Sequence, residues 1–322
     1  MKVPVESIKN ILLVRNDRFG EFLLNIPAFR AIRQSFPSAR LVLAVNPYVE
    51  GLARCIDFVD KVIVWENSRH GLGQMMHFSN ILKGERIDLC IIFNPSKELN
   101  IISFLAGVSV RVGYDRKWGF LLNRKIQDKK YLGQKHEIDY NLELAALAGA
   151  RITDKSLSLR IDNSLIRGLL RQASIEGCRN LVAIHPWTSD PIKQWSVDKF
   201  KELARRLEND SGNKVIIIGG KEEADKSQKY FSDFIDFTGK TTLAELAALL
   251  KECKLLISGD SGPVHLASCV GTPVVAIFRN DIPGKSPVRW GPVSMGSSVV
   301  EKPSLEDITV EEVFAKVKIC LG

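Results

Sequence analysis

The sequence contains few cysteines, and they are scattered. None belongs to a C-x-x-C pair or stands at metal-ligand spacing from a histidine, which argues against a zinc centre or a disulfide framework. The pattern favours reduced, buried thiols instead. The six cysteines among the 322 residues are at positions 55, 90, 178, 253, 269 and 320.

Long apolar runs are absent as well. No stretch approaches the roughly 18–20 apolar residues that a membrane-spanning helix needs. No apolar signal-peptide segment precedes the first expected strand. We therefore expect a cytoplasmic protein whose contact with a membrane is peripheral.

Three familiar phosphate-binding and metal-binding patterns are missing. The sequence has neither the G-x-x-x-x-G-K-[ST] loop nor the G-x-G-x-x-G turn of nucleotide-binding folds. It also has no D-x-D pair that would hold a divalent ion against a diphosphate. We therefore expect no cofactor and no metal ion. Any diphosphate would have to be neutralised by cationic side chains and by the N–H groups of a helix.

Negative charge is in short supply. The chain has 37 acidic residues against 45 lysines and arginines, which gives a net charge of +8. Such a surplus favours nucleic acid, an anionic membrane face or phosphorylated small molecules as partners, and an ordinary solvated basic surface explains it equally well. We do not expect nucleic acid, because no recognised motif and no interleaving of aromatic and basic residues is present.

Apolar strand-like segments alternate with amphipathic helical segments along the whole chain, beginning with a strand at residues 8–15 and a helix at 22–36. Strand-helix-strand units in series predict a parallel sheet covered by helices on both faces. The series runs twice, which predicts an α/β fold of two Rossmann-like, doubly wound domains facing a central cleft. We place these domains at residues 1–165 and 166–322, with the last helix a candidate to pack back on the N-terminal domain.

Ligands of open α/β sheets bind at the carboxyl ends of the strands, so the loops at these ends are the candidate site. The first such loop is RNDRFGE, at residues 15–21. Gly20 lets the backbone approach a ligand. Glu21 stands where a helix begins, and the helix dipole stabilises a carboxylate there. It is either a helix-end residue of that kind or a general base.

Two further loops belong to the second series. In HPWTSDPIKQW, Thr188 and Ser189 offer hydroxyl groups and Lys193 offers a charge for phosphate, although a plain solvated loop is the alternative. In IIGGKEE, Glu222 or Glu223 either holds a ribose hydroxyl pair or caps a helix.

The fourth loop is GDSGPVH, at residues 259–265. Ser261 and Gly262 stand at a helix N-terminus, where free N–H groups and the helix dipole bind anions. Asp260 would repel phosphate, so it should face a hydroxyl, a lysine or the backbone. His265 lies one turn into the helix, as a structural residue or as a ligand contact. Together with Lys193, the loop predicts a diphosphate pocket.

Six motifs, in this order, resemble the bacterial heptosyltransferases of glycosyltransferase family 9, and the resemblance covers nearly the whole chain. It implies the GT-B fold, with an N-terminal acceptor domain and a C-terminal nucleotide-sugar domain. It also implies an inverting, metal-independent transfer of heptose from an ADP-sugar to the lipopolysaccharide inner core. The motifs are RNDRFGEFLLNIPAFRAIRQSFPSARL, RVGY, HPWTSDPIKQW, IIGGKEEA, GDSGPVHLASCVGTPVVAIF and ITVEEV.

The resemblance implies roles for single residues. Glu21 matches the catalytic base, where many members carry aspartate after the same glycine, and Asp17 is the second candidate. A phosphorylated glycolipid (lipid A/inner core) at the inner membrane face would be the acceptor. The donor-binding residues would be Thr188, Ser189, Lys193, Glu222, Glu223, Asp260, Ser261, Gly262 and His265. The acceptor-binding residues would be Gly20, Lys97, Arg111 and Arg116.

The chain departs from the family after Phe278, where it reads RNDIPG instead of the frequent GPTDP. Arg279 is a positive charge without a counterpart there. Alternatives to an ADP-heptose-using transferase are a family member with another donor or acceptor, an epimerase on the same fold, and a non-catalytic relative that binds nucleotide sugars.

Overall fold

The computed structural model describes residues 7–66, 68, 70–209 and 212–322. The chain divides into two compact units. Unit 1 comprises Met1–Tyr131 and Glu137–Ser156, and unit 2 comprises Leu132–His136 and Leu157–Gly322. The second unit therefore begins shortly before the position expected from the sequence, and it also takes in one short earlier segment.

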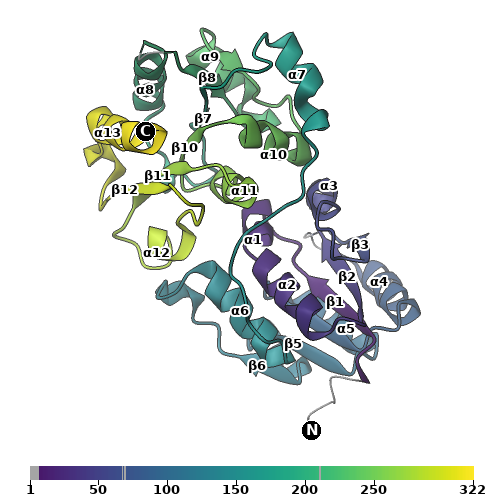
Figure 1. Cartoon of the computed structure of the whole chain (residues 1–322). Coiled ribbons are helices and arrows are strands. Elements are labelled where there is room, and N and C mark those ends of the chain that lie inside the picture. Colours follow the sequence, from purple (N-terminus) through teal and green to yellow (C-terminus); the bar gives the residue numbers. More distant parts are fainter. Residues whose placement is uncertain (1–6, 67, 69, 210–211) are drawn as a thin grey trace. The chain divides into compact units, whose positions relative to one another are not determined.

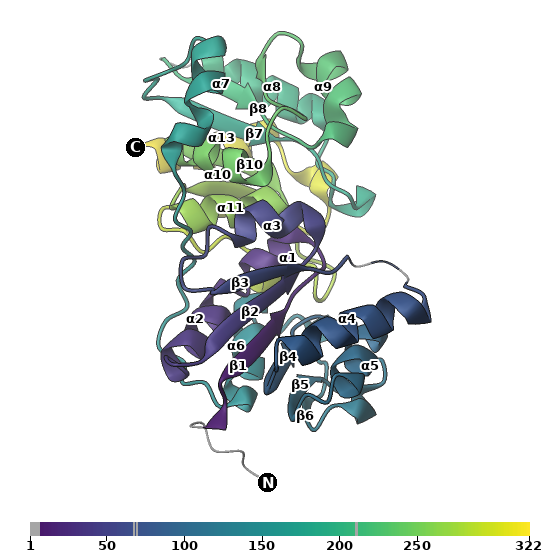
Figure 2. The same cartoon turned by 90° about the vertical axis from the view of Figure 1, so that its right-hand side faces the viewer.

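Unit 1 is built on a six-stranded parallel sheet in the order β3-β2-β1-β4-β5-β6 (Figure 2). Helices α2 and α6 pack together, as do α4 and α5. The strands are β1 (Asn10–Val14), β2 (Arg40–Val45), β3 (Lys61–Val64), β4 (Leu89–Ile92), β5 (Val110–Tyr114) and β6 (Arg124–Ile126). The helices are α1 (Phe19–Leu23), α2 (Ile26–Ser35), α3 (Glu50–Ala53), α4 (Leu72–Gly84), α5 (Lys97–Leu105) and α6 (Glu137–Ala148).

Unit 2 repeats this plan with a parallel sheet in the order β12-β11-β10-β7-β8-β9 (Figure 1). Its strands are β7 (Leu181–His185), β8 (Lys214–Ile217), β9 (Ile235–Asp236), β10 (Leu255–Gly259), β11 (Val274–Arg279) and β12 (Ser298–Lys302). Its helices are α7 (Arg167–Gln172), α8 (Val197–Asn209), α9 (Ala224–Phe231), α10 (Leu243–Glu252), α11 (Gly262–Val270), α12 (Pro287–Trp290) and α13 (Val310–Leu321).

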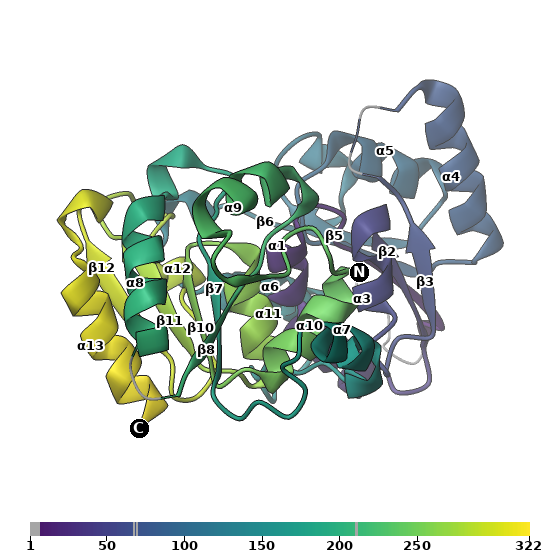
Figure 3. The same cartoon turned by 90° about the horizontal axis from the view of Figure 1, so that it is seen from above.

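The last helix lies within unit 2. Helix α13 packs against α8 and against β11 and β12 (Figure 3). Val313 and Val317 bring apolar side chains that are fully buried in the core of this unit. Burial of a valine of this kind contributes about 1.5–3 kcal/mol, so these side chains anchor the helix on the sheet of unit 2.

The helix expected at residues 22–36 is broken in the structure. Helix α1 begins earlier, at Phe19, and ends at Leu23, and α2 begins at Ile26 with Pro27 in its first turn. Proline lacks an N–H group, so it starts a helix well and interrupts one when it lies further inside. Asn25 fills the break by donating from Nδ2 to the Glu21 carbonyl oxygen at 2.7 Å. As a result Glu21 lies on a separate short helix.

Both sheets reverse their strand order at one place, between β1 and β4 in unit 1 and between β7 and β10 in unit 2. Loops that leave neighbouring strands in opposite directions make room for a ligand at such a point. Three of the four loops selected from the sequence follow β1, β7 and β10 and so lie at these switch points, whereas the loop with Glu222 and Glu223 follows β8.

Candidate active site

The loop after β1 places Glu21 in the first turn of α1, next to buried Gly20. Arg18 occupies the N-cap position, and its side chain accepts no hydrogen bond from the first N–H groups of the helix. Burial raises the pKa of Glu21, and the negative charge of Asp17 raises it further. A carboxylate of this kind holds a proton more readily than an ordinary glutamate, which suits a general base.

Asp17, the second candidate base, is already engaged. Its Oδ1 accepts a hydrogen bond from Arg15 Nε at 2.6 Å, and its backbone oxygen accepts one from the Tyr48 hydroxyl at 3.0 Å. The Arg15 side chain is only 4% exposed. Arg15 therefore holds the Asp17 carboxylate in place, and from this position its charge raises the pKa of Glu21.

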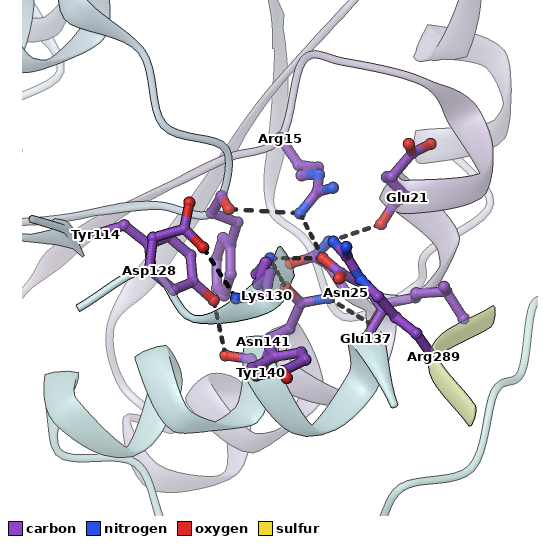
Figure 4. A network of polar contacts seen from close by, with 12 residues as sticks. Arg15, Glu21, Asn25, Tyr114, Asp128, Lys130, Glu137, Tyr140, Asn141 and Arg289 are labelled. Carbon is purple, nitrogen blue, oxygen red and sulfur yellow. Dashed lines mark hydrogen bonds and ion pairs between the residues drawn. The ribbon is translucent and has the colours of Figure 1, made fainter. Parts of the chain in front are cut away.

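A buried ion cluster lies beside this loop, and nothing in the sequence patterns indicated it. Glu137, at the start of α6, has no exposed surface. Its Oε1 lies 2.5 Å from Lys130 Nζ and 3.6 Å from Arg15 Nη1. Lys130 also donates to Asn141 Oδ1 at 3.4 Å and lies over the ring of Tyr114. Figure 4 shows these side chains gathered together, with the carboxylate of Glu21 pointing away from them.

Charge balance keeps this cluster ionised. Burial opposes the charge of Arg15, but Asp17, Glu137 and Glu21 together outweigh it and hold the pKa of Arg15 above its ordinary value. A buried ion pair that loses one partner leaves an uncompensated charge in the interior, which is costly. The cluster therefore fixes Arg15, the first residue of the loop that carries Glu21.

The three expected acceptor-binding cations have other contacts within unit 1. The Lys97 ammonium lies 4.2 Å over the ring of Trp118. Arg111 donates from Nε to Leu121 O at 2.8 Å, and its guanidinium lies over the ring of Phe104. Arg116 pairs with Asp128 at 2.9 Å and keeps an exposed side chain. Lys97 and Arg116 are thus exposed to solvent, whereas Arg111 braces the chain, and binding of an acceptor by these residues stays a prediction.

In unit 2 the loops after β7 and β10 meet through an ion pair. Lys193 ends the 3-10 helix η6 (Pro191–Lys193), and its Nζ lies 2.5 Å from Asp260 Oδ2. The Asp260 side chain is 9% exposed. Burial raises the pKa of Asp260, and the charge of Lys193 opposes this effect. The sequence required Asp260 to face a hydroxyl, a lysine or the backbone, and the structure selects the lysine.

The N-terminus of α11 has no side-chain cap. Ser261 occupies the N-cap position, but its hydroxyl lies 2.8 Å from Ser258 Oγ and 3.1 Å from His185 Nδ1. Burial lowers the pKa of His185 to about 3, so this imidazole is neutral. These contacts fix the Ser261 side chain. Its hydroxyl oxygen therefore accepts no hydrogen bond from the first N–H groups of α11, which begins at Gly262. Such a helix end attracts an anion.

The remaining expected donor-binding residues differ in their exposure and in their hydrogen bonds. Glu223 Oε2 accepts the Gly220 N–H at 2.8 Å and so caps the 3-10 helix η7 (Lys221–Glu223). Glu222 is exposed, and Ser189 is also exposed. Thr188 accepts a hydrogen bond from the Asp190 N–H at 3.3 Å. Glu223 therefore fits the helix-capping interpretation, and a ligand contact by either glutamate stays a prediction.

His265 is buried to 4% exposure in α11, and its ring lies 6.2 Å from that of Trp290. Both interpretations given to His265 from the sequence, a structural residue or a ligand contact, stay predictions.

Sequence reasoning missed Lys285. Its Nζ lies 2.9 Å from Asp190 Oδ2, which joins the loop after β11 to the loop after β7. The only signal in the sequence was that the loop after Phe278 departs from the family pattern. Arg279, which had no assigned role, forms an ion pair with Asp281 at 2.6 Å and donates to Ile192 O at 3.1 Å.

The described residues contain neither a candidate metal cluster nor a candidate membrane-spanning helix. Within the part of the chain that the structure describes, no group of three or more His, Cys, Asp or Glu side chains could hold a metal ion. No helix in these same residues combines the length and the apolar character needed to cross a membrane. The six cysteines are free thiols.

Comparisons with known proteins agree with this geometry. A model of the family described as Glycosyltransferase family 9 (heptosyltransferase) matches residues 75–316. Lipopolysaccharide core heptosyltransferase OpsX of Haemophilus influenzae is 22% identical over 312 residues, which cover 93% of this chain and 86% of that protein.

Solved structures show the same fold. The structure of Escherichia coli ADP-heptose lps heptosyltransferase II has a TM-score of 0.82 at 20% identity, covering 97% of this chain and 98% of that one. Escherichia coli heptosyltransferase WaaC with ADP has a TM-score of 0.76 at 18% identity, covering 97% and 99%. The expected GT-B type, with two Rossmann-like parts, is confirmed.

Proposed function

The chain belongs to glycosyltransferase family 9, the heptosyltransferases, and on this premise we propose that it transfers a heptose from an ADP-sugar to the lipopolysaccharide inner core. Two relatives support this donor and acceptor: one is named an ADP-heptose lps heptosyltransferase, and another was solved with ADP. The observation that carries the proposal is the Lys193–Asp260 pair beside the uncapped N-terminus of α11, at the switch point of unit 2.

The proposed reaction is a single displacement with inversion at the sugar. An acceptor hydroxyl oxygen forms a bond to the anomeric carbon as the bond from that carbon to the diphosphate oxygen breaks. Glu21 accepts the hydroxyl proton. Lys193 and the N–H groups at the start of α11 stabilise the negative charge that develops on the leaving diphosphate. No step requires a metal ion, because these groups supply the positive charge.

A donor and acceptor panel tests this proposal. The protein is incubated with ADP-, UDP- and GDP-sugars and lipid A-core acceptors in the presence of EDTA, and the glycolipid mass is read by mass spectrometry. We expect a gain of one heptose with ADP-heptose alone, and NMR of the product should show the inverted anomer. Transfer only from another nucleotide sugar, or loss of transfer with EDTA, would contradict the proposal. An unchanged acceptor with every donor would favour a non-catalytic relative.

We also propose that the chain acts at the cytoplasmic face of the inner membrane through exposed aromatic residues of unit 1. Trp118 and Phe120 are 46% and 69% exposed. Lys117 and Trp118 both have positive φ, at 47° and 67°, which costs roughly 1–3 kcal/mol per residue. Asn100 Nδ2 holds this turn by donating to Lys117 O at 3.0 Å.

A turn held in a strained conformation that exposes two aromatic rings suits the interface of a bilayer, where such rings are favoured. Lys97 and Lys117 would face its anionic head groups. Sedimentation with vesicles containing anionic lipid tests this. We expect the double variant Trp118→Ala, Phe120→Ala to lose binding. Ile319→Ala, which removes an exposed apolar side chain from unit 2, should bind like the wild type. Equal binding by all three proteins would contradict the proposal.

A further inference from the structure

Two lysine–aspartate pairs lie at the carboxyl ends of three neighbouring strands of unit 2. Lys193 pairs with Asp260, and Lys285 pairs with Asp190, at 2.5 and 2.9 Å. The aspartates and lysines come from the loops after β7, β10 and β11, which are adjacent strands in the sheet. Asp260 lies within electrostatic range of both lysines and of Asp190. The four side chains therefore form one neutral charge cluster next to the start of α11.

The loop that carries Lys285 is held in place from several sides. Arg279 ties its beginning to Ile192 O at 3.1 Å. Gly133, in the left-handed region with φ of +61°, packs so closely that a Cβ there would lie 2.3 Å from Gly284 N. The carbonyl oxygen of Gly291, beyond Lys285, lies 3.1 Å from His136 Nε2. These contacts hold the backbone on both sides of Lys285 in place.

The two lysines differ in exposure. The Lys193 side chain is 16% exposed and the Lys285 side chain 39%. Lys193 is therefore the inner cation and Lys285 the outer one. Asp190 is also partly exposed, and its Oδ1 accepts the Ile192 N–H at 3.3 Å, so this aspartate stays in place whether or not Lys285 is bound to it. The ion pair with Lys285 is the part of the cluster that can open to solvent at little cost.

A nucleoside diphosphate brings at least two negative charges, whereas Lys193 supplies one cation that Asp260 already neutralises. Arg279 is held more firmly than Lys285, because Asp281 accepts two hydrogen bonds from its guanidinium at 2.7 and 2.6 Å and Ile192 O accepts a third at 3.1 Å. Lys285 can move from one carboxylate to a phosphate without leaving its loop. Lysine is a common phosphate ligand that acts as a flexible point charge.

We propose that Lys285 is a second phosphate-binding cation of the donor site, and that Asp190 holds it in the ligand-free chain and competes with the diphosphate for it. The identity of the nucleotide rests on the proposed function, but the cluster itself does not. The proposal predicts effects of opposite sign for the two partners, which a merely structural ion pair would not show.

Isothermal titration with ADP and with adenosine tests this. We expect Lys285→Ala to weaken ADP binding about tenfold, the worth of one charge-assisted hydrogen bond, and to leave adenosine binding unchanged. Asp190→Asn keeps the oxygen that accepts the Ile192 N–H and removes the competing charge, so it should strengthen ADP binding severalfold. Lys285→Arg should retain most of the affinity.

The control is Lys254→Ala, which removes an exposed lysine just before β10, at the amino end of the strand and away from the carboxyl ends that carry the cluster. It should bind ADP like the wild type. Equal ADP affinity for the wild type and Lys285→Ala, or a loss of affinity in Asp190→Asn, would overturn the proposal. A wild type that binds UDP or GDP in place of ADP overturns the proposed donor alone, and the same variants then decide the role of Lys285 with that nucleotide.

Discussion

Lys130 Nζ lies 2.5 Å from Glu137 Oε1 in the interior of unit 1, where the lysine side chain is 9% exposed and the glutamate side chain 1%. The same oxygen faces Arg15, so one carboxylate serves two cations. Arg15 begins the loop that ends in Glu21, and Glu137 begins α6. The contact between Glu137 and Arg15 thus links the loop of the candidate base to a helix more than a hundred residues away in the sequence.

Replacing this shared carboxylate should destabilise unit 1. Glu137→Gln removes the carboxylate that Lys130 and Arg15 share in the interior, and breaking a buried ion pair costs about 3–5 kcal/mol. Urea unfolding measures the change. Asp139→Asn, two residues on, removes the partner of exposed Lys155 and should cost no more than about 1 kcal/mol. Equal stability of the two variants would show that the buried cluster contributes no more to the free energy of unfolding than an exposed ion pair.

The catalytic role of Glu21 gives a prediction that separates chemistry from binding. Glu21→Gln should lower kcat by roughly 10²–10⁴-fold, because the acceptor proton loses its base. ADP affinity should stay at the wild-type value. Steady-state kinetics and titration calorimetry measure the two quantities, and an unchanged kcat would remove the residue from this role.

The pH dependence follows from the raised pKa of Glu21. A base works only when deprotonated, so activity should fall on the acid side at a higher pH than an ordinary glutamate would give. Asp17→Asn removes a charge that raises this pKa, so the acid limb of the kcat/KM profile should move to lower pH. A limb that stays in place, or moves to higher pH, would contradict the assignment of the base.

Loss of Lys193 should make stability depend on pH in a definite direction. Burial raises the pKa of Asp260, and Lys193→Ala removes the charge that opposes this effect. A carboxyl whose pKa is higher in the folded than in the unfolded chain binds its proton more tightly on folding, so folding stability rises as pH falls. Thermal melts should therefore show the largest deficit of Lys193→Ala near pH 8 and a smaller one near pH 5. A deficit that grows towards acid pH would contradict the pairing.

Gly219, after β8, has a packing role that can be checked without activity. A Cβ there would lie 2.7 Å from the indole of Trp187 and 2.9 Å from Thr238 Cγ2. Gly219→Ala should therefore cost about 1–3 kcal/mol through overpacking. The matched change Gly168→Ala, where a Cβ meets nothing within 4 Å, should cost nothing. Denaturant unfolding compares them, and an equal effect would refute the packing argument.

The sequence predicted those features that are encoded locally. Strand and helix periods are visible in short windows, and small residues after apolar strands mark the loops at the switch points, which is how Glu21, Lys193 and Ser261 were found. Contacts between distant residues leave no such pattern. Lys285 and Asp190 are 95 positions apart, and nothing in either segment indicates the other. The break between α1 and α2 was missed because Asn25 and Pro27 were included in an apolar helical pattern.

Cocrystallisation of the protein with ADP tests the account most directly, because it locates the diphosphate. We predict electron density for the two phosphates beside the start of α11 at Ser261 and Gly262, with Lys193 Nζ within hydrogen-bonding distance and no metal ion between them. ADP bound elsewhere in unit 2, or a diphosphate held through a divalent ion with Lys193 still bound only to Asp260, would contradict the account.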